Sequence, residues 1–367
     1  MSTALYCLAD LHLAGFPWSR RDEFYGDAFR ALESAEQVIL QDNPGCAYKA
    51  VILSGDITDQ KAIEDDTSMA LCKFIKNLHA ASIQVYYVNG NHDMSKRGQL
   101  GHVGVYGGIH IHEKVTQIHD FTVYGLDWLP RTVLKEKIQN VPECDILFLH
   151  CAFQHLLGFQ GAYDLTKEDI PEHIPNVFVG DVHVTDITTN SRGTDIVSPG
   201  PLHPCSIAQM GPHGMMRIKS DEMTWEFLEI VTRHVLDYTI GDSEIAAVDI
   251  ANNIKAEVAT KRLKPHCVIR YTSDESDLAD QVMSLVKDVV HIHDKKSNTG
   301  HMMTPQQRVE MLSAKEETSL EKEVEAFEAE DPETAAFVKD LLLSTDPEKI
   351  LAEEYNTCVL PSERIPC

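Results

Sequence analysis

One layout recurs five times in the first half of the chain: a short apolar strand that ends in acidic, amide or imidazole side chains. Runs of β-branched and aromatic residues bounded by such polar clusters are typical of buried strands. Five strands that each deliver polar groups at their C-terminal ends indicate one site at one edge of a sheet. The strands with the segments that follow them are Tyr6–Ala9 with Asp10–His12, Val51–Leu53 with Ser54–Asp59, Val85–Val88 with Gly90–Asp93, Ile146–Leu149 with His150, and Val177–Val179 with Gly180–His183.

The spacing of apolar residues between these strands predicts the fold class. Helical periodicity over Asp22–Gln41 and Ile63–Ala80 separates the first three strands, which is a βαβαβ pattern. From Gly107 the pattern changes to alternation over Ile109–Ile118 and Phe121–Leu126, so strands there pair directly. We expect an α/β (α+β) domain over residues 1–230, built as a β-sandwich flanked by helices. Its remaining strands are expected at Asp195–Val197, Met215–Ile218 and Trp225–Ile230.

A small α+β domain with a linker is expected over residues 231–300. Ser243 can cap a helix that runs to about Thr260, and Lys295–Gly300 has the composition of a linker. The other expected elements are a strand over Cys267–Tyr271, a helix over Ser276–Val286 and a strand over Asp288–Ile292.

Residues 301–367 predict an acidic helical tail. Thr304-Pro305, Asp331-Pro332 and Asp346-Pro347 each place a capping residue before a proline at the first helical position. Between residues 311 and 354 there are 14 acidic and 4 basic side chains. This pattern fits a solvated face packed on its own domain, and it also fits a helix that docks on a partner. The position after a linker favours docking.

The composition limits the possible settings and partners. No run approaches the ~18 apolar residues that a membrane span requires, and the N-terminus has no signal sequence. Nine scattered cysteines without a C-x-x-C pair indicate reduced thiols and a cytoplasmic protein. The net charge is −25, of which −13 lies in residues 1–230 and −12 in residues 231–367. DNA affinity depends largely on phosphate contacts, so this chain needs a partner to bind DNA tightly.

The polar groups at the strand ends form a mixed oxygen and nitrogen ligand set that suits Mn²⁺, Fe²⁺ or Zn²⁺. Seven ligands are too many for one tetrahedral site and suit two metals about 3.5–4 Å apart. Phosphate-ester hydrolysis needs an activated water and stabilisation of both reacting oxygens, which a two-metal centre supplies. The seven are Asp10, His12, Asp56, Asn91, His150, Asp181 and His183.

Each motif alone also has a plain structural interpretation. D-x-H occurs by chance, G-D-x-x-D is a common turn, G-N-H-D fits a hairpin turn, and His150 could be a packed histidine. Their order, with each motif directly after a strand, favours the metal centre.

The series D-x-H, G-D-x-x-D, G-N-H-D, an isolated His and G-x-x-H resembles the calcineurin-like metallophosphoesterase superfamily over roughly residues 4–230. The resemblance implies a helix-flanked β-sandwich and two-metal phosphoester hydrolysis. It also implies that Asp56 bridges the two metals. The first metal would be bound by Asp10, His12, Asp56 and His183, and the second by Asp56, Asn91, His150 and Asp181.

The same resemblance implies catalytic roles for three residues. His92 would lie beside the scissile phosphate and stabilise the transition state or protonate the leaving oxygen. Asp93 could orient that imidazole, and Asp59 closes the G-D-x-x-D motif. One residue departs from the family pattern: Asp181 stands where the family has the first histidine of G-H-x-H. A carboxylate there favours a harder ion, Mn²⁺ or Mg²⁺.

Three further features are similar to the SbcD-type DNA repair exonucleases, which include viral recombination nucleases. They are Asp22–Phe29 (DEFYGDAF), Val197–Pro201 (VSPGP), and the α+β domain followed by a helical tail. The similarity implies a DNA exonuclease or endonuclease in repair and recombination. It also implies a homodimer whose C-terminal helices dock on an SbcC-like SMC-family ATPase. The alternatives are a stand-alone phosphodiesterase or phosphatase acting on a nucleotide or phosphoprotein, and a non-catalytic scaffold with a decayed site at Asp181.

Overall fold

The computed structural model describes residues 2–16, 22–60, 63–93, 102–156, 163–241 and 245–297. All of these residues belong to one compact unit, Met1–Gly300. The three proline-initiated helices expected after Thr304 lie outside the described residues. The domain boundary expected at residue 231 stays a prediction.

The first sheet has six strands in the order β12-β11-β1-β2-β3-β4. Strands β1 to β4 are parallel to one another, and β11 is antiparallel to both β1 and β12. Parallel pairing brings the C-terminal ends of β1, β2 and β3 to the same edge of the sheet. The strands are β1 Thr3–Leu8, β2 Tyr48–Ser54, β3 Gln84–Val88, β4 Ile109–His110, β11 Gly214–Lys219 and β12 Trp225–Glu229.

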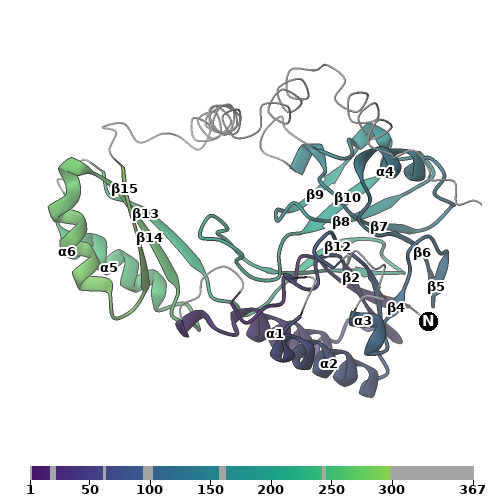
Figure 1. The fold of residues 1–367 in the computed structure, drawn as a ribbon, viewed down its shortest axis with the longest axis horizontal. Coiled ribbons are helices and arrows are strands. Elements are labelled where there is room, and N and C mark those ends of the chain that lie inside the picture. Colours follow the sequence, from purple (N-terminus) through teal and green to yellow (C-terminus); the bar gives the residue numbers. More distant parts are fainter. Residues whose placement is uncertain are drawn as a thin grey trace, which may run out of the picture. The chain divides into compact units, whose positions relative to one another are not determined.

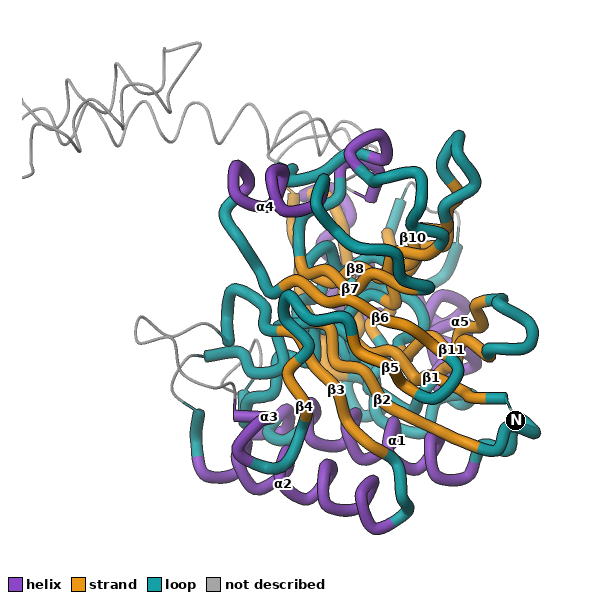
Figure 2. Tube along the Cα trace, turned by 90° about the vertical axis from the view of Figure 1, so that its right-hand side faces the viewer, coloured by secondary structure: helices purple, strands orange, loops and turns teal. Residues whose placement is uncertain are grey.

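The second sheet also has six strands, in the order β5-β6-β7-β8-β10-β9. Its four inner strands are parallel, and β5 and β9 are antiparallel edge strands. The two sheets pack face to face (Figure 2) through one apolar core that includes Leu5, Ile52 and Phe148. The strands are β5 Thr116–Ile118, β6 Phe121–Leu126, β7 Ile146–His150, β8 Asn176–Gly180, β9 Thr185–Thr189 and β10 Asp195–Pro199. The predicted sandwich is confirmed.

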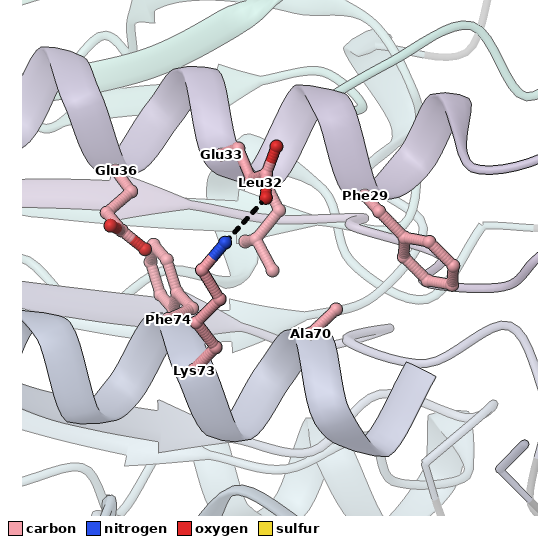
Figure 3. A pocket seen from close by; sticks show the side chains of 7 residues that line it. All are labelled: Phe29, Leu32, Glu33, Glu36, Ala70, Lys73 and Phe74. Carbon is pink, nitrogen blue, oxygen red and sulfur yellow. Dashed lines mark hydrogen bonds and ion pairs between the residues drawn. The ribbon is translucent and has the colours of Figure 1, made fainter. Parts of the chain in front are cut away.

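Helices cover the outer faces of both sheets because their apolar sides share a core with the strands. Helices α1 (Asp27–Gln41) and α2 (Asp65–Ala80) pack on the first sheet, and α4 (Arg131–Ile138) packs on the second (Figure 2). The groove between α1 and α2 (Figure 3) is lined by four apolar and three charged side chains, and two of the charged ones, Lys73 and Glu33, form an ion pair of 2.8 Å. The short elements are α3 His102–Val105 and the 3₁₀ turns Asp22–Phe24, Gln154–Leu156, Lys167–Asp169 and Ser273–Glu275.

Two expected elements are each divided in the structure. The helix expected over Asp22–Gln41 is a 3₁₀ turn followed by α1, because Gly26 between them has a φ of 75° that no helix allows. The strand expected over Ile109–Ile118 is split into β4 and β5, which belong to different sheets. The alternation of apolar and polar residues indicates an extended strand. It does not indicate where the chain passes from one sheet to the other.

The residues after Thr232 form a parallel three-stranded sheet in the order β13-β14-β15, with two helices packed against it (Figure 1). Strand β13 was not anticipated. Helix α5 begins at Ala247 rather than directly after Ser243, which itself lies outside the described residues. Strand β15 continues through Lys295 to Ser297, where a linker was expected. The elements are β13 Val235–Thr239, α5 Ala247–Val258, β14 His266–Thr272, α6 Ser276–Val286 and β15 His291–Ser297.

Arg233 ties this smaller sheet to the first helix of the sandwich. Its Nε lies 2.7 Å from Asp27 Oδ2 and its Nη2 lies 3.1 Å from Asp27 Oδ1, a two-point guanidinium–carboxylate contact. Nη1 donates to the Lys264 carbonyl oxygen at 2.6 Å, and Arg233 is 9% exposed. This buried ion pair fixes the position of the smaller sheet against helix α1.

Candidate metal centre

The five polar segments predicted at strand ends meet at one place, but the strands come from both sheets. Strands β1, β2 and β3 belong to the first sheet, whereas β7 and β8 belong to the second. The Asp181 amide after β8 donates to Asp10 Oδ1 after β1 at 2.9 Å, which joins the two sets. The expectation of a site at one edge of one sheet is therefore wrong. The sequence pattern marks the ends of strands but does not assign a strand to a sheet.

Five of the seven predicted ligands have a positive φ, a backbone conformation that is uncommon for residues other than glycine. Such conformations persist only where the surroundings enforce them, and they concentrate at functional sites. The chain therefore turns sharply at three of the five strand ends. The residues are Asp10 (50°), His12 (39°), Asp56 (46°), Asp181 (93°) and His183 (55°).

Glycines make room for the ligands around Asp56 and His150. A Cβ at Gly90 would come closer than 3.0 Å to both Asp56 Oδ1 and the Asp56 backbone nitrogen. A Cβ at Gly55 or at Gly180 would likewise come closer than 3.0 Å to His150 Nδ1. The glycine in three of the motifs is thus required by the close approach of the ligands themselves.

Asp56 lies between the two sides of the centre. Its Oδ1 is 3.3 Å from His150 Nε2, and its Oδ2 is 3.7 Å from His12 Nε2. Burial alone would raise the pKa of Asp56, but the His150 and His12 imidazoles and the His92 amide hold it below its usual range. Burial also opposes the charged form of His150, and the Asp56 carboxylate nevertheless raises the pKa of that imidazole. A carboxylate in this central position suits the expected bridging role.

His12 and His183 face each other across the other side, with their Nε2 atoms 2.9 Å apart. The far nitrogen of each ring has its own partner. His12 Nδ1 lies 3.4 Å from Asp59 Oδ1, and His183 Nδ1 lies 2.7 Å from the side-chain amide nitrogen of Gln209. Asp59 and Gln209 thereby set the orientation of the two rings. Gln209 was not predicted, because it lies in an irregular segment without a strand or a recognisable motif.

Two observations show that the donor set fits divalent metal ions. Asp10 Oδ2 is buried without a hydrogen-bond partner among the described residues, an arrangement that is costly unless a cation occupies the space beside it. The side-chain amide of Asn91 lies beside the same groups: with its nitrogen turned toward them it donates to the Asp56 oxygens at 3.0 and 3.2 Å and to His150 Nε2 at 3.3 Å. With its oxygen turned there instead, the amide adds an oxygen donor beside Asp56 and His150, which suits a cation bound between them.

The candidate ligand atoms form three overlapping groups, each within 4.8 Å: His12, His183 and Cys205; His12, Asp56 and His92; and Asp10, Asp56 and His150. Asp181 lies next to the third group, with Oδ1 3.7 Å from His150 Nε2 and a side chain that is 25% exposed. It is thus on the side where the second metal is expected. Its role as a ligand stays a prediction. Cys205 was not anticipated as part of the site.

The other two predicted catalytic residues lie in the same G-N-H-D loop. His92 is half-exposed, and its Nδ1 is 2.6 Å from the Asp59 carbonyl oxygen. The Asp93 carboxylate accepts hydrogen bonds from the backbone amides of Gly90 (2.9 Å), Thr58 (3.0 Å) and Ile57 (3.2 Å). Asp93 therefore joins this loop to the G-D-x-x-D loop. The direct action on the His92 ring that the sequence suggested stays a prediction.

The fold and the ligand set define a metal-dependent phosphoester hydrolase. The sequence matches the calcineurin-like phosphoesterase family over residues 4–197, more than half of the chain, and the chain belongs to that family. This family uses a dinuclear divalent metal centre, for which the ligand groups above are the candidates.

Two individual proteins show how far the similarity reaches. The chain is 28% identical over 167 residues to the DNA double-strand break repair protein Mre11 of Sulfolobus acidocaldarius, covering 42% of each chain, so it spans less than half the length of that relative. A dimetal phosphatase from Danio rerio aligns with 59% of this chain and 91% of its own, at 13% identity and a TM-score of 0.34. No helix in the described part of the chain combines the length and apolar character needed to cross a bilayer.

Proposed function

We propose that this chain is a two-metal DNA nuclease, an exonuclease or endonuclease, that works in DNA repair or recombination. The observation that carries the chemistry is the convergence of carboxylate, amide and imidazole ligands from two sheets around Asp56. The choice of DNA is supported by the similarity to a DNA double-strand break repair protein. Mn²⁺ is the proposed ion, with Mg²⁺, Fe²⁺ and Zn²⁺ as alternatives.

The site residues divide the work of phosphodiester hydrolysis. The bound ions would activate a water and neutralise charge on the phosphate. Asp10, His12, Asp56, Asn91, His150, Asp181 and His183 would hold them. His92 Nδ1 is engaged by a carbonyl oxygen, so its Nε2 remains for the substrate. In its imidazolium form the ring also carries a proton on Nε2, which can hydrogen-bond a phosphate oxygen or be transferred to the leaving 3′ or 5′ oxygen.

The acidic charge determines which partners the proposal needs. With a net charge of −25, the chain supplies little of the phosphate attraction on which DNA binding depends. We propose that an SbcC-like SMC-family ATPase, docked by residues 301–367, supplies the missing basic surface. Homodimerisation, a DNA-seating role for residues 231–300 and a cytoplasmic location belong to the same proposal.

The alternative is a stand-alone phosphodiesterase or phosphatase that acts on a nucleotide or phosphoprotein, and the acidic charge favours it because such substrates need no basic groove. The decisive experiment compares the full chain with Mn²⁺ on linear duplex DNA, a small aryl phosphodiester, a nucleotide and a phosphopeptide. Degradation of DNA from its ends, increased by the ATPase, supports the nuclease. Turnover of the small substrates with intact DNA, in the presence of the ATPase, would reject it. No turnover of any substrate would favour a scaffold.

A further inference from the structure

The loop after β10 brings a thiol to the metal centre. Cys205 Sγ and the ligating nitrogens of His12 and His183 all lie within 4.8 Å of one another. The motifs that identify the family do not include this cysteine, and its neighbours in sequence gave no sign of a ligand. The loop that follows β10 after Pro199 carries the thiol of Cys205 to the predicted ligands His12 and His183.

Hydrogen bonds fix this loop against the D-x-H segment, so the position of the thiol is built into the fold. The Leu202 amide donates to the Asp10 carbonyl oxygen at 3.3 Å. The buried imidazole of His203 contributes a second link, with Nε2 2.9 Å from the Leu11 carbonyl oxygen. Both acceptors, the carbonyl oxygens of Asp10 and Leu11, belong to the D-x-H motif. Cys205 follows His203 by two residues.

A third link runs through Gln209. The Cys205 amide donates to Gln209 Oε1 at 2.6 Å, and the nitrogen of the same side-chain amide lies 2.7 Å from His183 Nδ1. Gln209 thus contacts both the backbone of Cys205 and the imidazole of His183. Asp10 belongs to the same first-metal ligand set, and its buried Oδ2 has no hydrogen-bond partner among the described residues. That oxygen is an independent sign that a cation binds here.

We propose that Cys205 is an additional, sulfur ligand of the first metal, beside His12 and His183. The two halves of the centre then differ in character. Thiolate and imidazole from Cys205, His12 and His183 favour Zn²⁺ or Fe²⁺ at the first metal, whereas the predicted ligands of the second metal beside His150 are oxygen donors, Asp56, Asn91 and Asp181, which favour Mn²⁺ or Mg²⁺. The centre is therefore asymmetric and takes a softer ion on the side of Cys205. This inference rests on the dinuclear centre of the proposed function but not on its DNA substrate.

The test is a titration of the full chain with Co²⁺, followed by absorption spectroscopy. The wild-type protein should show a sulfur-to-cobalt charge-transfer band in the near ultraviolet together with visible d–d bands. Cys205→Ser should lose the first band and keep the second, and Cys205→Ala should behave in the same way if the serine variant folds poorly. Cys72→Ser, on α2 and outside the ligand groups, is the matched control and should keep both bands.

The outcomes separate this inference from the metal centre as such. A charge-transfer band that is absent from the wild type, or that persists in both Cys205 variants, overturns the sulfur ligand while leaving the centre in place. A wild-type protein without any d–d bands overturns the centre and the sulfur ligand together. In competition experiments we expect Cys205→Ser to lower Zn²⁺ affinity by about tenfold or more, with a much smaller effect on Mn²⁺. Equal losses for both ions would contradict the proposal.

Discussion

His92 Nδ1 lies 2.6 Å from the backbone carbonyl oxygen of Asp59. Because a carbonyl oxygen can only accept, Nδ1 carries the proton and Nε2 is the atom presented outward, 4.0 Å from Asp56 Oδ2. The partner is a main-chain atom, so no side-chain substitution at Asp59 removes it. The G-D-x-x-D loop thereby orients the residue that we propose to act on the phosphate.

Replacing His92 tests that role. We expect His92→Ala to reduce phosphodiester cleavage by about 10²–10⁴-fold, the range typical of a lost acid–base group, with unchanged metal content. His92→Asn can still donate to the Asp59 carbonyl oxygen but has no counterpart of Nε2, so it should be equally impaired. The measurements are steady-state cleavage rates and elemental analysis. Activity in either variant within about twofold of wild type would exclude the catalytic role.

Asp181 is tested by the number of metals bound. Asp181→Ala should bind one Mn²⁺ ion in place of two, because the second site loses a ligand beside His150. Asp181→His restores the histidine of the family motif, and we expect it to bind two ions and to shift preference toward Zn²⁺. Elemental analysis and anomalous diffraction from Mn²⁺-soaked crystals give the count. Two fully occupied ions in the alanine variant would show that Asp181 is not a ligand.

Gly90 offers a steric test of the centre. Its φ is not in the left-handed region, so Gly90→Ala acts only through a methyl group that would collide with Asp56 Oδ1 and the Asp56 backbone nitrogen. We expect loss of tight metal binding and of the added thermal stability that Mn²⁺ confers through binding to the folded state. The control is Gly241→Ala, whose Cβ would meet nothing within 4 Å. Thermal unfolding with Mn²⁺ and with a chelator measures the difference, and an identical Mn²⁺ response in both variants would refute the steric argument.

His213 should contribute to the loss of stability at acidic pH. Burial lowers the pKa of this imidazole to about 4, and its Nδ1 lies 2.9 Å from the Pro201 carbonyl oxygen. In the unfolded chain a histidine has a pKa of about 6.5, so between pH 6.5 and 4 the unfolded state binds more protons and stability falls as the pH falls. The loss amounts to about 2–3 kcal/mol.

His213→Asn retains a donor at the position of Nδ1 for the Pro201 carbonyl oxygen and removes the titration. Its free energy of unfolding, measured with urea from pH 7.5 to 4.5, should decline with pH less steeply than that of the wild type, by up to about 1.4 kcal/mol per pH unit. Above pH 7 the two slopes should agree. Parallel curves throughout the acidic range would show that His213 does not titrate in this way.

The positions of the motifs at strand ends were predictable because each motif follows a strand and its spacing is local, whereas the role of its residues as ligands stays a prediction. All seven predicted ligands lie at the centre that the strand ends form, and the sandwich follows from the change in periodicity near Gly107. What was missed depends on tertiary structure. Cys205 and Gln209 reach the site through an irregular segment, and the assignment of β4 and β5 to different sheets leaves no mark in the alternation of side chains. Strand β13 is only five residues long and follows no turn motif.

The division of the predicted ligands between two sheets has a consequence for the synthesis of the protein on the ribosome. When a ribosome has released the first hundred or so residues, the chain already carries Asp10, His12, Asp56 and Asn91, with the strands that position them. His150 and His183 arrive only with the second sheet, and the loop with Cys205 arrives later still. A nascent or truncated chain that ends before Asp181 therefore lacks predicted ligands of both metals, and we expect hydrolytic activity only after the second sheet has been synthesised and packed.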